Sequence, residues 1–204
     1  MKLHYNPASP FVRMVTVTAN ELGIRDQIED IPTGEFLPVK VHGGVSADNP
    51  LGRIPALVTD HGTAIHDSRV ICEYLCHHAG DKEILPDEPV KRFRMLTLQS
   101  LAVGVMDTGV ALRYETFLRP EEKRWPEWID RQQARLTAAL DDLENNWKTE
   151  LSSVNCGSIA VACMLGYLDF RYASMGWRDG RPNLAAFHEG FAKRPSMMAT
   201  MPPA

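Results

Sequence analysis

One proline most narrowly limits how this chain can fold. Pro55 interrupts an apolar run that begins at Ile54. Because proline has no N–H to donate within a sheet, a short strand is expected to begin just after it, within residues 56–59. The turn residues 60–62 and a second short segment, 63–66, complete a predicted β-hairpin. An Xaa-Pro bond at such a tight turn is also where a cis peptide bond costs little.

A helix is predicted to begin directly after this hairpin. Asp67 and Ser68 are good N-cap residues, and apolar side chains then recur at helical spacing to about His78. The backbone of Ile54 would therefore lie beside a helix N-terminus. A backbone edge offers main-chain hydrogen bonds, and a helix N-terminus offers N–H groups and positive potential. The pattern favours binding of a small peptide that ends in a carboxylate; the alternative is a hairpin and a capped helix without a ligand.

The first part of the chain alternates short strands with helices. A strand is predicted at 2–5, a helix at 11–22 that ends at Gly23, and a second strand at 27–31. Two strands joined through a helix should be parallel with a right-handed crossover. Residues 32–49 show no clear period and indicate a long functional loop with room for one helical turn. This order of elements is typical of a thioredoxin-like domain with a mixed four-stranded sheet.

The later part of the chain is helical almost throughout. Residues 80–89 have the charge and proline content of a linker, after which apolar side chains recur at helical spacing. The expected helices cover residues 90–118, 128–147, 159–172 and 184–191, and a last turn begins at Pro195. Because 159–172 is nearly all apolar, we expect it to be a buried central helix. The predicted domains are an α/β domain at 1–79, the linker at 80–89 and an all-α domain at 90–204.

Composition narrows the class of protein. The chain has 204 residues, of which 44% are hydrophobic, and this suffices for one or two packed domains. A net charge of −4 gives no electrostatic case for nucleic acid. No apolar run approaches the roughly 20 residues that cross a bilayer, and the N-terminus lacks a secretion signal. We therefore expect a cytoplasmic protein with no nucleic-acid or membrane partner.

The cysteines do not have the spacing of a metal site. They are Cys72, Cys76, Cys156 and Cys163. The first two share one face of a predicted helix with the histidines at 77–78, so a metal site is conceivable there. Buried, reduced thiols are the favoured interpretation, and no metal is expected.

These segments together resemble the glutathione S-transferase superfamily, and the resemblance covers essentially the whole chain. It is carried by Ser9-Pro10-Phe11 at the first helix, Ile54-Pro55, Asp67-Ser68, and 165–171 in the expected core helix, which is similar to that of bacterial members. The resemblance implies an N-terminal thioredoxin-like domain with a C-terminal helical bundle domain. It also implies that glutathione binds as the cosubstrate. Pro55 would be cis, Ile54 would pair with the cysteinyl part of glutathione, and Asp67 and Ser68 would hold its γ-glutamyl end.

The resemblance to the serine-type classes implies that Ser9 is catalytic. The nucleophile would be the glutathione thiol, whose free pKa is about 8.5. A hydroxyl at a helix N-terminus can donate a hydrogen bond to the thiolate, and the helix dipole adds positive potential. Tyr5 is the rival for this role, and Ser9 could instead simply cap the helix. The chain has no cysteine before Cys72, which argues against a cysteine-type reductase.

The resemblance also implies secondary contacts. Lys40 and His42 in the long loop could meet the glycine carboxylate of glutathione. The expected electrophile pocket is lined by Phe11, Met106, Val110, Arg113 and Tyr114. Arg13 could hold the active-site turn or a ligand carboxylate, or be a solvated helix charge. A helix-capping box is usual before the core helix, and here Asn155 can begin it with Ser158 as a weaker partner than a carboxylate.

The predicted function is transfer of the glutathione thiol to small electrophilic molecules, an activity associated with detoxification. The alternatives are a non-catalytic binding or regulatory protein on the same scaffold and a glutathione-dependent reductase or isomerase. A homodimer is expected, with contacts from the helix that begins at Ser68 and the helix that begins at Val90. Four charges on these helices could meet their opposites across a two-fold axis: Arg69, Glu73, Arg92 and Arg94.

Overall fold

The computed structural model of the protein describes residues 1–34 and 43–203. The chain divides into two compact units, and each is described by itself. The first unit comprises Met1–Arg92 with Arg194–Ala204, and the second comprises Phe93–Lys193. The division therefore falls just beyond the expected linker. The C-terminal residues, which were expected in the helical domain, group with the first unit.

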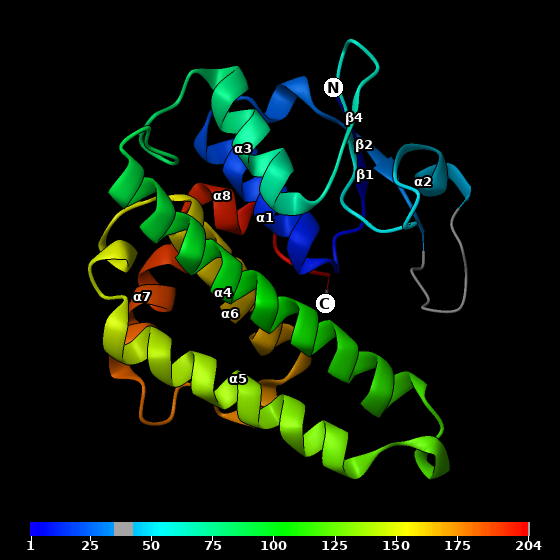
Figure 1. Ribbon diagram of the computed structural model, residues 1–204, viewed down its shortest axis with the longest axis vertical. Coiled ribbons are helices and arrows are strands. Elements are labelled where there is room, and N and C mark those ends of the chain that lie inside the picture. Colours follow the sequence, from blue (N-terminus) through cyan, green and yellow to red (C-terminus); the bar gives the residue numbers. More distant parts are fainter. Residues whose placement is uncertain (35–42, 204) are drawn as a thin grey trace. The chain divides into compact units, whose positions relative to one another are not determined.

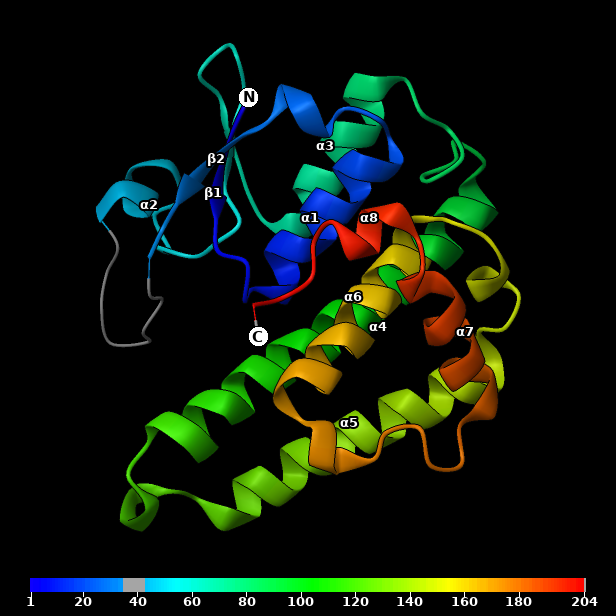
Figure 2. The same cartoon turned by 180° about the vertical axis from the view of Figure 1, so that it is seen from behind.

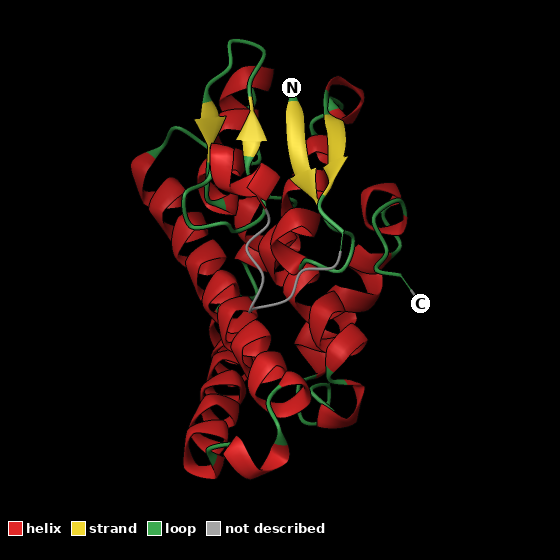
Figure 3. Cartoon of the chain, turned by 90° about the vertical axis from the view of Figure 1, so that its right-hand side faces the viewer, coloured by secondary structure: helices red, strands yellow, loops and turns green. Residues whose placement is uncertain are grey.

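The first unit is built on a four-stranded mixed sheet (Figure 1). Its strands and helices are β1 (Lys2–Tyr5), α1 (Pro10–Glu21), β2 (Glu29–Pro32), α2 (Gly43–Asp48), β3 (Leu57–Val58), β4 (Ala64–Ile65), α3 (Ser68–Ala79) and α8 (Pro195–Met198). The strand order is β2-β1-β3-β4. In Figure 3, β1 and β2 point the same way and β3 points oppositely, in agreement with the pairing. The predicted thioredoxin-like arrangement is confirmed.

Helices cover both faces of this sheet. Successive strand side chains point to opposite faces. Leu3 of β1 is fully buried, and the next residue, His4, places Nε2 2.7 Å from Asp48 Oδ2 of α2. Helices α1 and α3 pack together, and the Thr18 hydroxyl of α1 donates to Cys72 Sγ of α3 at 3.4 Å. The four cysteines are free and buried, as the reduced-thiol interpretation predicted.

The C-terminal segment is anchored to both ends of α1. Arg13, only 8% exposed, donates from Nη2 to the Met197 carbonyl at 3.0 Å. Near the other end of α1, both oxygens of Glu21 accept from Arg194, at 2.8 and 2.7 Å, and Ser196 also donates to this carboxylate. The interpretation of Arg13 as a solvated helix charge is therefore wrong. Its side chain ties the helix that follows Ser9 to α8.

The second unit is all helical. Its α-helices are α4 (Pro89–Arg113, which begins in the first unit), α5 (Pro126–Asn146), α6 (Cys156–Arg171) and α7 (Pro182–Ala192). The predicted helix at 90–118 is α-helical only to Arg113, and Tyr114–Leu118 continues it as a π-helical turn. Apolar spacing could not distinguish the two, because the wider turn shifts the periodicity only slightly. Helix α6 is buried along most of its length, which confirms the predicted central helix.

Helices α4 and α6 run parallel to each other (Figures 1 and 2). At one end, Gly157 lies so close to Leu98 that an added Cβ would come within 2.8 Å of its side chain; further along, Gly109 faces Tyr167. Residues of α6 therefore meet residues of α4 that precede them by about 58 positions. Among the described residues, the segment Pro89–Leu118 is long and apolar enough to cross a membrane by length and composition alone: an 18-residue window within it has a mean hydropathy of 1.4, and 44% of that window is buried.

Asn155 begins α6 with the expected capping box. Its Oδ1 accepts from the N–H groups of Gly157 and Ser158 at 2.9 and 3.0 Å, and the Ser158 hydroxyl accepts from the Asn155 N–H at 2.9 Å. The reciprocal bond therefore forms without a carboxylate. Asn155 Nδ2 also donates to the Glu150 carbonyl at 2.6 Å, which ties the start of α6 to the preceding turn.

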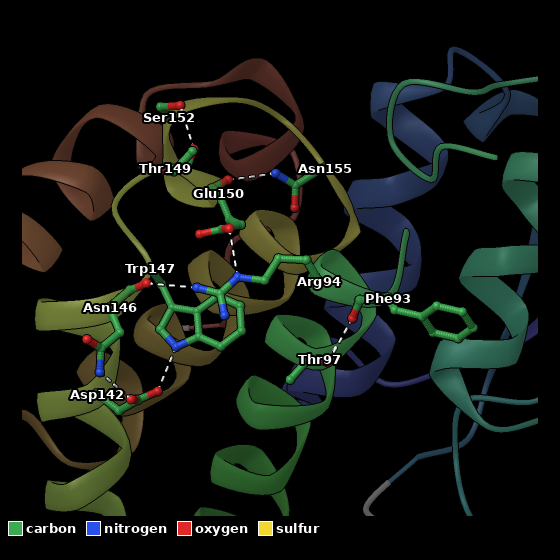
Figure 4. Close-up of polar contacts among 10 residues, drawn as sticks. All are labelled: Phe93, Arg94, Thr97, Asp142, Asn146, Trp147, Thr149, Glu150, Ser152 and Asn155. Atoms are coloured by element: carbon green, nitrogen blue, oxygen red, sulfur yellow. Dashed lines mark hydrogen bonds and ion pairs between the residues drawn. The ribbon is translucent and has the colours of Figure 1, made fainter. Parts of the chain in front are cut away.

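An arginine joins the early part of α4 to the connection between α5 and α6 (Figure 4). Arg94 donates to Glu150 Oε1 at 2.8 Å and to the Asn146 carbonyl at 2.9 Å, and its guanidinium carbon lies 3.8 Å from the centre of a Trp147 ring. The neighbouring Phe93 ring points away from this network in Figure 4 and is 66% exposed.

Candidate active site

The sheet topology brings three predicted site residues to the same end of the sheet in the first unit. Ser9 follows the C-terminal end of β1, Ile54 precedes the N-terminal end of β3, and Ser68 follows the C-terminal end of β4. Because β3 is antiparallel to both β1 and β4, these three strand ends lie at the same end of the sheet. The His4 N–H donates to the Ala56 carbonyl at 2.9 Å and fixes this end of the β1–β3 pair.

Ser9 is the N-cap of α1, and its hydroxyl keeps a proton to donate. Ser9 Oγ accepts from the Val12 N–H at 3.3 Å. A hydroxyl has one donor proton besides its acceptor lone pairs, so capping and donation to a ligand can coexist. The described residues provide no acceptor for the Ser9 proton. The turn before Ser9 is held by Asn6, whose carbonyl accepts from the Ser9 N–H at 3.1 Å and whose Oδ1 accepts from the Ala8 N–H at 2.9 Å.

Tyr5, the rival residue, lies in a different electrostatic environment. Burial and then the negative charge of Asp30 raise the pKa of its phenol, while Arg25 opposes them. Asp30 and Arg25 form an ion pair at the β2 edge of the sheet. Asp30 and Arg25 are therefore the charged groups that act on the Tyr5 hydroxyl.

The backbone of Ile54 is available to a ligand. The Ile54–Pro55 bond is cis, as predicted. Within the described residues, neither the N–H nor the carbonyl of Ile54 has a hydrogen-bond partner, whereas the segment after Pro55 is paired with β1. The preceding turn is fixed by Asn49, 3% exposed, which donates from Nδ2 to the Arg53 carbonyl at 2.8 Å and accepts from the Leu51 N–H at 3.1 Å.

The N-terminus of α3 offers donors next to a carboxylate. Asp67 caps the helix: Oδ1 accepts from the Arg69 N–H at 3.0 Å, and Oδ2 pairs with Arg69 Nη2 at 2.9 Å. Partial burial alone would raise the pKa of Asp67, but the hydrogen bonds from Arg69 outweigh it and lower the pKa. Ser68 is 2% exposed, and as the first helical residue its N–H has no acceptor within the helix. The peptide bond between His66 and Asp67 is also cis.

The remaining predicted residues are distributed between the two units. Phe11 belongs to the first unit, whereas Met106, Val110, Arg113 and Tyr114 belong to the second, and Met106 is fully buried. Lys40 and His42 lie outside the described residues. The electrophile pocket and the contacts to the glycine carboxylate therefore stay predictions. A separate open groove of about 420 Å³ between α4 and α5 contains none of the predicted site residues.

Sequence reasoning missed the residues that shape the site from outside it. Asn6 and Asn49 each fix a turn through side-chain bonds to the backbone, and the only signal was the turn composition of Asn6-Pro7 and Asn49-Pro50.

Comparison with known proteins places these features in a family. Residues 8–78 match the N-terminal domain of glutathione S-transferases, and residues 126–190 match the C-terminal domain. A curated relative from Escherichia coli K12, described as the uncharacterized GST-like protein YibF, is 35% identical over 210 aligned residues that cover 100% of this chain and 99% of the relative.

Two solved structures are similar over the whole chain. Both are of a glutathione transferase family member from Pseudomonas fluorescens Pf-5. One holds bound glutathione, with 43% identity, a TM-score of 0.96 and coverage of 100% of this chain and 99% of the other. The second holds S-(propanoic acid)-glutathione, with 42% identity, a TM-score of 0.92 and full coverage of both chains.

Proposed function

The chain belongs to the glutathione S-transferase family, and on that premise we propose that it conjugates the glutathione thiol to small electrophiles. One observation carries the proposal: the hydroxyl of Ser9 keeps a proton to donate at the N-terminus of α1. Ser9 lies at the same end of the sheet as Ile54 and Ser68. The Pseudomonas fluorescens relative supports it, because that protein holds glutathione and a glutathione whose sulfur carries a propanoic acid.

Each proposed contact uses a backbone or side-chain group at this end of the sheet. The unpaired backbone of Ile54 forms main-chain hydrogen bonds with the cysteinyl part of glutathione, beside the cis Pro55. The N–H and hydroxyl of Ser68 bind the γ-glutamyl carboxylate, and Asp67 binds the γ-glutamyl ammonium. Ser9 then donates to the sulfur. A hydrogen bond to the thiolate stabilises the charged form and lowers the thiol pKa from about 8.5, so that more thiolate exists near neutral pH.

The alternatives fit the structure less well. A cysteine-type reductase needs an accessible thiol, but the four cysteines are buried in α3 and α6. A non-catalytic member would need the Ser9 hydroxyl only as the N-cap of α1, a role that does not use the hydroxyl proton. Conjugation of electrophiles is a detoxification reaction, and we place it in a cytoplasmic homodimer.

The test compares Ser9→Ala with Ser9→Thr. Ser9→Ala removes the donor, so the pKa of bound glutathione, followed by thiolate absorbance, should rise toward the free value. Turnover with a standard electrophile should fall by about 10² or more, the usual effect of losing one donor to a developing anion. Ser9→Thr keeps the hydroxyl and should retain most of the activity.

Glutathione affinity separates the possible failures. Calorimetry should show nearly unchanged binding to Ser9→Ala, because the hydroxyl meets the sulfur rather than the ends of the tripeptide. Full activity in Ser9→Ala would move the role to Tyr5 or to backbone amides. Absence of glutathione binding to the wild type at millimolar ligand would refute the transferase proposal itself.

A further inference from the structure

Arg113 of α4 and Arg171 of α6 lie side by side on adjacent helices of the second unit. Helices α4 and α6 run parallel, and Gly109 of α4 faces Tyr167 of α6: a Cβ on Gly109 would lie 3.2 Å from the Tyr167 ring. Arg113 lies four residues after Gly109, and Arg171 lies four residues after Tyr167, so each is one turn further along the contacting face. The register of the two helices therefore brings Arg113 beside Arg171.

Within the described residues, the guanidinium groups of Arg113 and Arg171 have no carboxylate partner. Arg113 stacks on Phe117, with 3.4 Å from Cζ to the ring centre, and Arg171 stacks on Phe170, at 3.7 Å. Burial and then the positive charge of Arg113 lower the pKa of Arg171, which agrees with two cations in proximity. Both arginines are only partly exposed.

The surrounding hydroxyls add donors rather than anions. Burial raises the pKa of Tyr172 to about 12 and also raises the pKa of Tyr167. Both phenols therefore stay protonated at neutral pH. The Tyr172 hydroxyl donates to the Gly109 carbonyl at 2.5 Å and holds the end of α6 against α4. The cluster thus contains two cations and two neutral phenols with no anion among them.

A purely structural role explains only half of this arrangement. Arg171 lies in the last turn of α6, where a cation stabilises the negative end of the dipole, whereas α4 continues beyond Arg113 as the π-helical turn Tyr114–Leu118. That effect favours the charge of Arg171 alone. It does not favour two charges beside each other, because like charges repel at short range. An anion between the two guanidiniums would convert the repulsion into two charge-assisted hydrogen bonds.

We propose that Arg113 and Arg171 together bind the carboxylate of an aromatic organic acid. The planar fork of each guanidinium matches a carboxylate, and the rings of Phe117 and Phe170 provide apolar surface for the body of the acid. A hydrated inorganic anion would gain little from that surface. This binding does not depend on the proposed transferase activity.

The binding probe is 4-chloro-3-nitrobenzoate, used without glutathione so that calorimetry measures binding alone. The neutral amide, 4-chloro-3-nitrobenzamide, keeps the same body without the charge.

The binding experiment compares Arg113→Gln, Arg171→Gln and Arg131→Gln. Arg131 is an exposed arginine of α5 in the same unit and serves as the matched control. Loss of either Arg113 or Arg171 should weaken benzoate binding about tenfold or more, which is the usual effect of removing one charge-assisted hydrogen bond. Binding of the amide should not change. Arg131→Gln should bind the benzoate like the wild type. Circular dichroism shows whether each variant is folded, and Arg171→Lys, which keeps the charge without the fork, should bind with intermediate affinity.

Three results would overturn the proposal: equal binding of benzoate and amide by the wild type, equal loss in Arg131→Gln, or displacement of the benzoate by inorganic phosphate at equal concentration.

Discussion

At the scale of single residues, Asp67 combines two roles that one pair of substitutions can separate. Its carboxylate caps α3 and carries the charge proposed to meet glutathione. Asp67→Asn keeps a good cap, so stability should change little, but glutathione binding should weaken by about 1.5–3 kcal/mol with the loss of a charge-assisted contact. Asp67→Ala should weaken binding similarly and also lose about 1 kcal/mol of stability. Calorimetry and thermal unfolding measure the two effects.

The control for this prediction is Asp26→Asn, which removes an exposed carboxylate of the same unit. It should leave both glutathione affinity and unfolding unchanged. Unchanged affinity in Asp67→Asn would show that the Arg69 pair already neutralises this carboxylate and that glutathione is held by Ser68 and Ile54 alone.

Residues whose roles depend on local chain geometry could be predicted from the sequence. Ser9 as a cap, Pro55 as a turn proline and Asp67 as a cap each follow from their immediate neighbours. Arg13 could not be assigned, because its partner carbonyl at Met197 lies 184 positions away. Such long-range pairs depend on tertiary packing, which local pattern does not encode.

At the scale of the helix, the contact between α4 and α6 predicts opposite effects for two glycines. Gly157→Ala should destabilise the protein by about 1–3 kcal/mol, because the added methyl would lie 2.8 Å from Leu98 in a packed interface. Gly104→Ala adds a methyl with no atom within 4 Å, so it should stabilise α4 by about 0.5–1 kcal/mol. Urea unfolding measures both, and a stabilised Gly157→Ala would contradict the close packing.

The attachment of α8 to α1 predicts a dependence of stability on pH. Hydrogen bonds from Arg194 lower the pKa of Glu21 more than burial raises it. A carboxylate whose folded pKa is depressed adds stability above its unfolded pKa of about 4.3, and that stability disappears as the pH falls through the folded pKa. Glu21→Gln should therefore cost about 2 kcal/mol at pH 7 and much less near pH 3.

Urea unfolding at the two pH values tests this prediction, with Glu29→Gln as the control. Glu29 is exposed and lies 4.0 Å from Lys2, so its loss should cost well under about 1 kcal/mol at either pH. A cost for Glu21→Gln that stays constant with pH would show that the side chain acts through packing rather than through its charge.

Element identities followed from periodicity, but element ends did not. The buried helix α6 was recognisable because nearly all of its side chains are apolar, and the capping residue Asn155 was recognisable from its type. The change from α-helix to π-helical turn at Tyr114 and the two-residue length of β3 were not. Both depend on which backbone groups find partners, and the sequence does not show this directly.

At the scale of the whole molecule, the charges proposed to pair across a dimer already have partners within the chain. The sequence suggested that four charges on two helices would find partners across a two-fold axis. Arg69 instead pairs with Asp67, Arg92 with Glu73, and Arg94 with Glu150, all within the chain. The sequence shows which charged residues exist, but not which carboxylate each arginine pairs with in the folded chain. We therefore base the expected dimer contact through these helices on their apolar side chains.

The exposed apolar residues of α3 and α4 carry the last prediction. Val70 is 50% exposed, Val90 77% and Phe93 66%, and the Phe93 ring points away from the polar network around Arg94 (Figure 4). We expect a homodimer, with a mass by light scattering at micromolar concentration of twice 22.8 kDa. Because a two-fold interface contains each residue twice, Phe93→Ser should remove about 3–6 kcal/mol and shift the mass toward that of the monomer. Met201→Ser, at a similarly exposed residue outside these helices, should stay dimeric. A wild-type mass of 22.8 kDa would refute the dimer, and a dimer insensitive to Phe93→Ser would place its interface on another surface.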